Sequence, residues 1–185
     1  MSTLREVIGS ELEPIDLDSA KEHLRVTNTD EDSYIVDIIT AARKYVENEI
    51  GETLHQATYN YYLDNFPSGD IEMPEPPLQS VTYVKYYDSD NSLQTLVADT
   101  DYRVDANSIP GVIEVIGSWP ATYDRTSAVQ IQFVAGESDY SQIDPNVIHN
   151  IKLKLAMFYE DREGEDEKKT KVLQNTLNKV KTPSF

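Results

Sequence analysis

The chain contains no cysteine, which excludes disulfide bonds, thiolate nucleophiles and cysteine-ligated zinc. Glycine is scarce, at 7 of 185 residues, and neither of the phosphate-binding patterns GxxxxGK[ST] and GxGxxG occurs. The GxSxG motif, which places a nucleophilic serine on a sharp turn, is missing as well. The sequence therefore contains no recognisable motif for nucleotide binding or covalent catalysis.

Long apolar runs are also missing. No stretch approaches the roughly 18 to 20 apolar residues that a membrane-spanning helix needs. The opening segment MSTLREVIGSELEP lacks the basic start and apolar middle of a secretion signal, so we expect a cytoplasmic protein without a membrane span. The hydrophobic share of 39% and the charged share of 26% are typical of a folded protein, and 185 residues suffice for one substantial core.

Positive charge is in short supply and unevenly spread. The chain has 16 Lys and Arg against 33 Asp and Glu, a formal net charge of -17. Residues 56–144 carry 3 basic and 14 acidic side chains (3 − 14 = −11), whereas residues 145–185 carry 8 and 6 (8 − 6 = +2). A general nucleic-acid binder needs clustered Lys and Arg to neutralise phosphates. The charge argues against that class and sets the C-terminal end apart.

The N-terminal part of the chain has helical periodicity. In IDLDSAKEHLRV, Asp16 or Asp18 can cap a short helix. A longer helix follows, for which Gly51 supplies the stop. Its apolar residues recur at three- and four-residue steps and predict a core-facing stripe: Ile35, Ile38, Ile39, Ala42, Val46 and Ile50.

Helical periodicity returns near the C-terminus. Pro145 suits the first position of a helix, and DPNVIHNIKLKLAMFYEDREG continues an apolar stripe as far as Gly164. A last helix is expected over EDEKKTKVLQNTLNKVKTPSF, with apolar residues on one face and lysines on the other. This segment is short for an independent helix, so its apolar face needs a partner.

Between the helical regions the apolar period changes to two. Short segments rich in Val, Ile, Thr and Tyr, separated by turn residues, predict antiparallel strands: ATYNYYLDNFP, IEMP, SVTYVKYYD, SLQTLV, DYRVD, GVIEVI and AVQIQFVAG. Pro74, Pro76 and Pro77 cannot donate ladder hydrogen bonds, so we expect an extended edge crossing there. We predict an α+β fold, with a helical core of residues 1–55 and 145–185 and an inserted antiparallel β module of residues 56–144.

Candidate catalytic and metal-binding residues are few. His23, His55 and His149 are far apart and match no spacing such as HExxH, so we expect ordinary surface or interface residues. One acidic pattern imitates a calcium loop: Asp88, Asp90, Ser92 and Asp99. Leu93 stands where that loop requires glycine, and DSDNS is typical of a hairpin turn, which is the interpretation we favour. We predict no catalytic residue, cofactor or metal.

Aromatic residues gather in the predicted β module, which holds most of the 12 tyrosines. Strand alternation puts Tyr59 and Tyr61 on one face and Tyr62 on the other. One face is expected to build the core, and the remaining tyrosines could contact a partner, because tyrosine is amphipathic. Trp119, the only tryptophan, precedes the last strand. It is either a buried loop anchor or an anchor for a partner.

The order of these parts is itself informative. The distinctive pieces are PPLQSV and YEDRE, within an ordered set of longer segments: IDLDSAKEHLRV, DEDSYIVDIITAARKYVENEIGETL, FPSGDIEMPEPPLQSVTYVKYYD, DYRVDANSIPGVIEVIGSWP, AVQIQFVAGE and DPNVIHNIKLKLAMFYEDREG. From Ile15 to Gly164 this set resembles the head-tail connector (adaptor) family of tailed bacteriophages, prophages and gene transfer agents. The match is to the longer form of that family, which has a β module between helices.

The resemblance implies a structural protein of the virion neck, assembled in the host cytoplasm. Such a protein would form a homo-oligomeric ring, expected to be a dodecamer, under the portal protein. The ring would extend the channel through which DNA passes without specific binding, and would be a platform for stopper or tail-terminator proteins. Two alternatives stay open: another phage morphogenesis protein, such as a stopper or tail-completion protein, and a metal-dependent enzyme.

In this family the C-terminal segment tends to dock onto the portal. The resemblance itself ends at Gly164, and the lysines and apolar face beyond it lead us to expect a portal or subunit interface there: Lys168, Lys169, Lys171, Leu173, Leu177, Lys179, Val180 and Lys181. The alternative is that this segment packs on its own subunit. An acidic body lining the channel would repel DNA phosphates and let the genome pass, although acidic surfaces also serve solubility alone.

Overall fold

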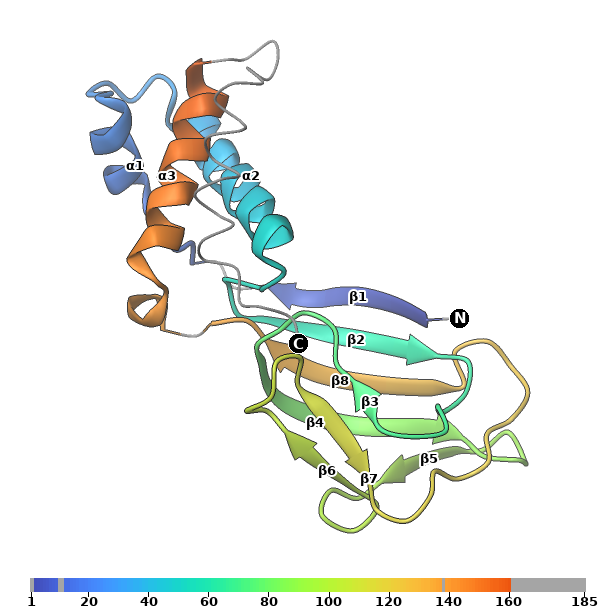
Figure 1. The fold of residues 1–185 in the computed structure, drawn as a ribbon. Helices are drawn as coiled ribbons and strands as arrows, with labels where there is room; N and C mark the ends of the chain where they lie inside the picture. The colour runs from blue at the N-terminus through green and yellow to red at the C-terminus, as the bar shows by residue number, and fades with distance from the viewer. Residues whose placement is uncertain (1, 10–11, 138, 161–185) are drawn as a thin grey trace. The chain divides into compact units, whose positions relative to one another are not determined.

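The computed structural model describes residues 2–9, 12–137 and 139–160. The chain divides into two compact units (Figure 1). The β unit comprises Met1–Ser10 and Gln56–Ser138, and the helical unit comprises Glu11–His55 and Asp139–Phe185. Each unit joins segments that are distant in the sequence. The predicted α+β class is confirmed.

Among the described residues, the helical unit contains three α-helices and one 3-10 turn: α1 (Leu17–Leu24), α2 (Asp32–Ile50), η1 (Tyr140–Gln142) and α3 (Pro145–Glu160). Asp16 caps α1 by accepting a hydrogen bond from the Ser19 N–H at 2.7 Å. Gly51 ends α2 with a φ of 76°, a left-handed conformation that glycine adopts without strain. Both predicted helix signals are confirmed. No described helix is long and apolar enough to cross a membrane.

The core of the helical unit forms where the apolar stripes of α2 and α3 meet. Tyr34 of α2 donates a hydrogen bond from its hydroxyl to the Phe158 carbonyl of α3 at 3.0 Å. The stripe predicted for α2 is buried together with residues of α3: Ile35, Ile38, Ile39, Ala42, Val46, Val147, Ile151 and Leu155. Burial of these side chains is the main stabilising contribution to this unit.

The larger sheet of the β unit is antiparallel throughout and has the order β1-β2-β8-β4-β5. Its strands are β1 (Ser2–Gly9), β2 (Ala57–Leu63), β4 (Leu78–Tyr87), β5 (Leu93–Leu96) and β8 (Val129–Ala135). Alternate residues of β8 are fully buried, from Val129 to Ala135. This alternation is the period of two that the sequence predicts for a sheet with one face in the core.

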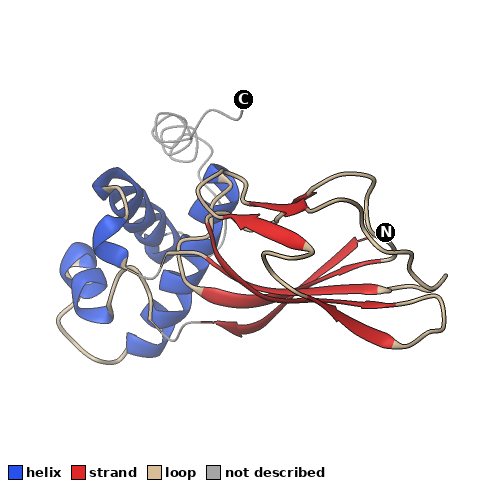
Figure 2. Ribbon diagram, turned by 90° about the horizontal axis from the view of Figure 1, so that it is seen from below, coloured by secondary structure: helices blue, strands red, loops and turns tan. Residues whose placement is uncertain are grey.

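A smaller antiparallel sheet, with the order β3-β7-β6, covers one face of the larger sheet (Figure 2). Its strands are β3 (Ile71–Glu72), β6 (Tyr102–Asp105) and β7 (Val112–Val115). Ile113 from β7 and Phe133 from β8 are both fully buried in the shared core. The β unit is therefore a sandwich of two sheets, and every strand predicted from the sequence is present.

Residues 2–9 differ from the prediction. The prediction places residues 1–55 in the helical core, whereas Ser2–Gly9 form strand β1, paired with β2. This segment has no clear alternation of apolar and polar residues, and its side chains are almost all exposed. The strand pairs with the edge of β2, and only Leu4 packs against the core. Periodicity reports burial, so it could not reveal this strand.

The proline segment also differs from the prediction. Residues 74–77 form bends rather than an extended crossing. Glu75 has a φ of 60°, and the Pro76–Pro77 peptide bond is cis. The segment connects β3 of the smaller sheet to β4 of the larger sheet. The chain must turn sharply to pass between two packed layers, which an extended segment cannot do.

Candidate assembly surfaces

The acidic segment after β4 is a turn. The Asp88 side chain accepts hydrogen bonds from the N–H groups of Asp90 and Ser92, both at 3.0 Å. These bonds and one from Gln94 lower the pKa of Asp88. The hairpin interpretation is confirmed by the pairing of β4 with β5. Within residues 2–9, 12–137 and 139–160, no group of three or more His, Cys, Asp or Glu side chains could hold a metal ion.

The structure places the three histidines in the helical unit. His23 lies in α1 and His149 in α3. Burial, followed by the charges of Lys152 and His149, lowers the pKa of His23. His55 is buried in a charge network with a structural role.

That network surrounds Arg43, which is 3% exposed on the apolar face of α2. Its Nε donates to Glu13 at 2.7 Å, and one terminal nitrogen donates to Glu47 at 2.6 Å. The same nitrogen lies 2.9 Å from His55 Nδ1. Glu47 also accepts a hydrogen bond from the Leu54 N–H at 2.7 Å. The network therefore ties the segment before α1 and the segment after α2 to the middle of α2.

The ionisation of the network favours the folded helical unit. Burial by itself would raise the pKa of Glu47, but the hydrogen bond with His55 and the charge and hydrogen bonds of Arg43 outweigh it and lower the pKa. Burial would likewise lower the pKa of Arg43, and its bonds with Glu13 and Glu47 raise it instead. This network was not predicted from the sequence. The sequence signal for it is an Arg within the apolar stripe of a helix, four residues before a Glu.

Trp119 lies against its own chain. Its ring stacks on Phe66 with centroids 4.6 Å apart and an angle of 3° between the planes. Its Nε1 donates a hydrogen bond to the Gly69 carbonyl at 2.7 Å. Trp119 is half-buried and Phe66 is buried, so the pair anchors the loop before β8 to the segment before β3. These contacts favour the loop-anchor interpretation of Trp119, and its role as a partner anchor stays a prediction.

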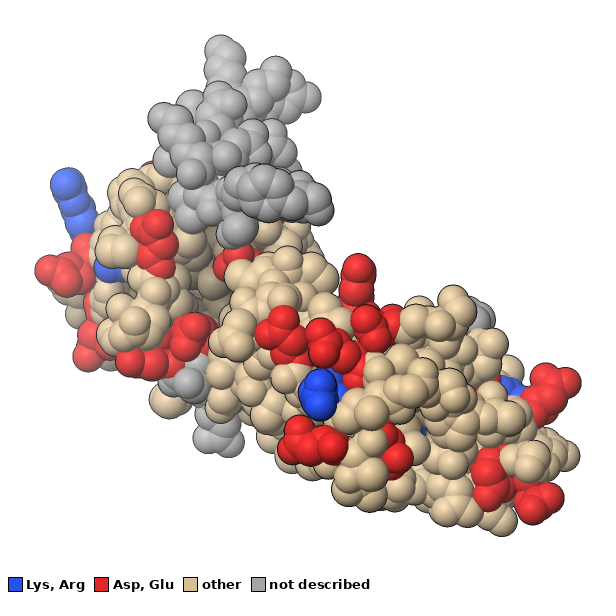
Figure 3. Space-filling model, turned by 60° about the horizontal axis from the view of Figure 1, so that its bottom comes forward, with Lys and Arg blue, Asp and Glu red and all other residues tan. Residues whose placement is uncertain are grey.

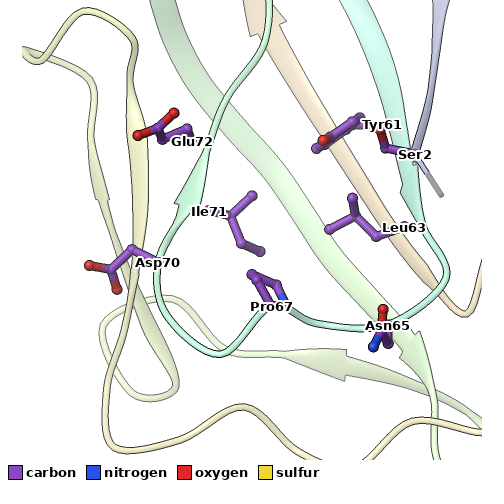
Figure 4. Close-up of a pocket in the computed structure, with 8 residues that line it drawn as sticks. All are labelled: Ser2, Tyr61, Leu63, Asn65, Pro67, Asp70, Ile71 and Glu72. Carbon is purple, nitrogen blue, oxygen red and sulfur yellow. The ribbon is translucent and has the colours of Figure 1, made fainter.

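A hollow of about 520 Å³ lies at one edge of the sandwich, between β2 and β3. Its lining comprises Ser2, Tyr61, Leu63, Asn65, Pro67, Asp70, Ile71 and Glu72. In Figure 4, Ile71 points toward Leu63 and Tyr61, while Asp70 and Glu72 point away from them. The two carboxylates therefore do not converge on a bound group, and the hollow lacks the arrangement of a catalytic site.

The face of the larger sheet that points away from the core has a composition of its own. Three rows of side chains cross it in register: Thr3, Tyr62, Gln130, Lys85 and Thr95, then Arg5, Asn60, Gln132 and Tyr83, then Ile8, Thr58, Val134 and Ser80. All of them are half-buried or exposed, and none is an Asp or Glu. We call these residues the amide–tyrosine face.

Hydrogen bonds hold the central side chains of the amide–tyrosine face in place. Gln132 donates to the Asn60 side-chain oxygen at 3.1 Å, and Asn60 donates to the Tyr62 hydroxyl at 3.2 Å. Gln130 donates to the Tyr83 hydroxyl at 2.8 Å. Burial and the neighbouring Tyr62 raise the pKa of Tyr83, so its hydroxyl stays protonated at neutral pH. The surface is preorganised, which reduces the entropy lost when it binds a partner.

The predicted C-terminal interface lies outside the described residues. This applies to Lys168, Lys169, Lys171, Leu173, Leu177, Lys179, Val180 and Lys181. Its role in docking stays a prediction. Among the described residues, the amide–tyrosine face contains no Asp or Glu and so contrasts with the acidic composition of residues 56–144.

Comparison with known families gives a match over the first part of the chain. The family model described as "Phage gp6-like head-tail connector protein" matches residues 14–116, which is more than half of the chain. No curated protein sequence matches the chain.

Solved structures match over nearly the whole chain. A chain in the neck of an empty GTA particle, computed with C6 symmetry, is 19% identical with a TM-score of 0.80, covering 99% of this chain and 97% of that one. A chain in the virion of a native gene transfer agent (GTA) particle is 18% identical with a TM-score of 0.78, covering 98% and 96%. A chain in the neck of a native GTA particle, computed with C12 symmetry, is 18% identical with a TM-score of 0.78, covering 99% of this chain and 97% of that one. At these identities the similarity establishes a shared fold.

Proposed function

Since this chain belongs to the phage gp6-like head-tail connector family, we propose that it is the adaptor of a phage neck, forming a ring beneath the portal protein. In this role it is a structural component of the virion. The ring extends the channel through which the genome leaves the head, and its lower surface receives the stopper or the tail-terminator protein.

The observation that carries the proposal is the family match over residues 14–116. The fold supports it, because both units have their counterparts in chains from GTA necks, with coverage of 99% for two of them. The match also favours a structural role over the alternative of a metal-dependent enzyme. Within the described part of the chain, neither the turn at Asp88 nor the hollow beside β3 gathers groups for catalysis.

The proposed ring consists of copies of this chain, and we expect a dodecamer. The neck of the native GTA particle was computed with C12 symmetry, and the neck of the empty particle with C6 symmetry. Both symmetries are compatible with a closed ring in which each copy contacts two neighbours.

The charge of the protein suits a DNA channel. With a net charge of -17 per copy, a ring presents a strongly negative field, and DNA phosphates are repelled from such a surface. Figure 3 shows one face of the molecule on which acidic side chains clearly outnumber basic ones. DNA would then pass through the ring without adhering to it.

Electron microscopy of the protein mixed with the portal protein encoded on the same genome tests the proposal. We expect an added ring on the outer end of the portal. Bare portal rings, with the protein folded by circular dichroism, would contradict the adaptor role and direct attention to the stopper or tail-completion alternative. Purified stopper and tail-terminator proteins from the same genome serve as the comparison set.

A further inference from the structure

The cations of the β unit are concentrated on one side of the sandwich. Residues 56–144 contain only 3 Lys and Arg, among 14 acidic side chains. Lys85 belongs to the amide–tyrosine face, with its Nζ 4.3 Å from the ring centroid of Tyr83. Arg5 of β1 is exposed on the same face, and neither cation forms an ion pair with a described residue. The amide–tyrosine face therefore carries positive charge that is not neutralised by residues of the same sheet.

A third cation extends this side. The guanidinium of Arg125 lies 4.0 Å from the ring centroid of Tyr87, two residues beyond Lys85 in β4. Acidic residues lie at the margin, at Asp88 and Asp90 in the turn after β4, at Asp64 directly after β2 and at Asp124 next to Arg125. The Asp88 carboxylate accepts hydrogen bonds from N–H groups of its own turn.

The opposite side of the sandwich has the reverse charge. On the outer face of the smaller sheet, Glu72 and Asp105 flank Val112, and Glu114 pairs with Arg103. We call these residues the acidic face. Glu72 points away from the interior in Figure 4, and both Glu72 and Glu114 are exposed. Among the described residues that pair on this face, Arg103 is the one cation.

The geometry of a sandwich makes these two surfaces suitable for repeated contacts. The two sheets pack through a shared core, so their outer faces point in opposite directions. A contact between unlike faces of two copies leaves one free face of each kind at the ends, and can therefore be repeated. Such heterologous contacts close into rings when the rotation between copies permits it.

We propose that the amide–tyrosine face binds the acidic face of a second copy of this chain, so that the β units pair head to tail around the ring. The inference rests on the proposed function, because it requires a ring. Unpaired Lys and Arg on one face and exposed carboxylates on the other provide charge complementarity, which fixes the direction of the contact. Tyrosines and amides already held by hydrogen bonds provide contact area at low entropic cost.

The absence of cysteine allows a direct test, because any thiol cross-link must come from an introduced residue. The variant Gln132→Cys with Glu114→Cys places one thiol on each face. Treated with a short bismaleimide after assembly on portal rings, it should give a ladder of covalent multimers in denaturing gels. Thr95→Cys with Glu72→Cys is a second pair, both at exposed positions. It keeps the test valid if the first variant does not fold.

The controls separate the possible failures. Gln132→Cys alone should give no multimers, and cross-linked dimers from it would overturn the proposal, because they would show like faces in contact. Gln132→Cys with Glu22→Cys, on the exposed surface of α1, measures random collisions. If electron microscopy shows rings but neither double-cysteine variant gives covalent multimers, the inference is overturned and the adaptor role stays intact. Portals that stay bare would overturn the adaptor role and, with it, the inference.

Charge reversal gives an independent readout. Arg5→Glu with Lys85→Glu should lower ring formation about tenfold or more, because like charges then face each other. Adding Glu72→Lys and Glu114→Lys to the same chain should restore it. Lys44→Glu is the matched control, since it also replaces a cation by glutamate but lies on the exposed surface of α2, outside both faces. We expect it to assemble as well as the wild type, and a loss equal to that of the first variant would contradict the proposal.

Discussion

At the scale of single residues, the most constrained position is Arg43. A guanidinium that is 3% exposed is stable in the folded state only because Glu13 and Glu47 balance its charge. The network joins the segments at residue 13 and at residues 54 and 55 to α2 by hydrogen bonds, in addition to the apolar packing of Leu54. The network has a structural role, and its contribution to stability depends on the ionisation of Glu47 and Arg43.

We predict that Glu47→Gln lowers the free energy of unfolding by roughly 1–3 kcal/mol at neutral pH, because it leaves Arg43 with one charged partner fewer. Denaturant unfolding at several pH values measures this. The pKa of Glu47 is lowered in the folded state, so the stability that its ionisation contributes is present above its ordinary pKa of 4.5 and is lost as pH falls through the folded value. The difference between variant and wild type should therefore shrink in acid.

Asp37→Asn is the matched control for this experiment. It neutralises an exposed carboxylate on the same helix, where changes are usually within about 0.5 kcal/mol. A Glu47 variant that behaved like Asp37→Asn at neutral pH would show that the network contributes nothing to stability.

At the scale of elements, the two sheets approach each other closely at Gly111, the residue before β7. A Cβ placed there would lie 2.5 Å from Leu78 Cβ in β4. The Gly111 carbonyl also accepts a hydrogen bond from the Met73 N–H at 2.8 Å, just after β3. Glycine is thus required by a close approach of backbone to a buried side chain, and Leu78 is 3% exposed.

We predict that Gly111→Ala destabilises the protein by roughly 1–3 kcal/mol, since the buried Leu78 cannot move aside without disturbing the core. Thermal or denaturant unfolding measures the change. Gly69→Ala is the control, because a Cβ at Gly69 meets nothing within 4 Å, and we expect it to be nearly neutral. Equal stability of the two variants would mean that the sheets can separate at this point without cost.

At the scale of the whole molecule, charge is distributed unevenly. The net charge is -17, yet residues 145–185 have a balance of +2, and the amide–tyrosine face of the β unit contains no Asp or Glu. A field of this kind steers association and opposes adhesion to DNA. Assembly should accordingly be sensitive to salt, because exposed charges are screened over about 8–10 Å at ordinary ionic strength.

We predict that replacing Lys168, Lys169, Lys171, Lys179 and Lys181 with glutamine weakens attachment to the portal. The physical reason is the loss of the positive charge that distinguishes this end of the chain. Occupancy of portal rings, scored by electron microscopy across a protein titration, measures it. Lys44→Gln, an exposed change in α2, is the control. Undiminished occupancy would remove the electrostatic part of the docking proposal.

Much of the fold could be predicted from the sequence because its signals are local. The cap at Asp16, the stop at Gly51 and the alternation in β8 each depend on neighbours within a few residues. The candidate surfaces could be predicted only in part. Tyr62 was expected to lie on the opposite face from Tyr59, but its alignment with Gln130 and Lys85 depends on the register of three strands.

The sequence by itself determined the absence of thiol chemistry, the α+β class, the positions of most helices and strands, and the family resemblance, because composition and periodicity follow directly from the order of residues. The tertiary structure decided what depends on pairing between distant segments. Strand β1 exists through its hydrogen bonds to β2, Arg43 is charged and buried because Glu13 is near it in space, and the two faces of the sandwich acquire opposite charge only once the strands are in register. Such non-local contacts leave no period in the sequence, so only the folded chain contains them.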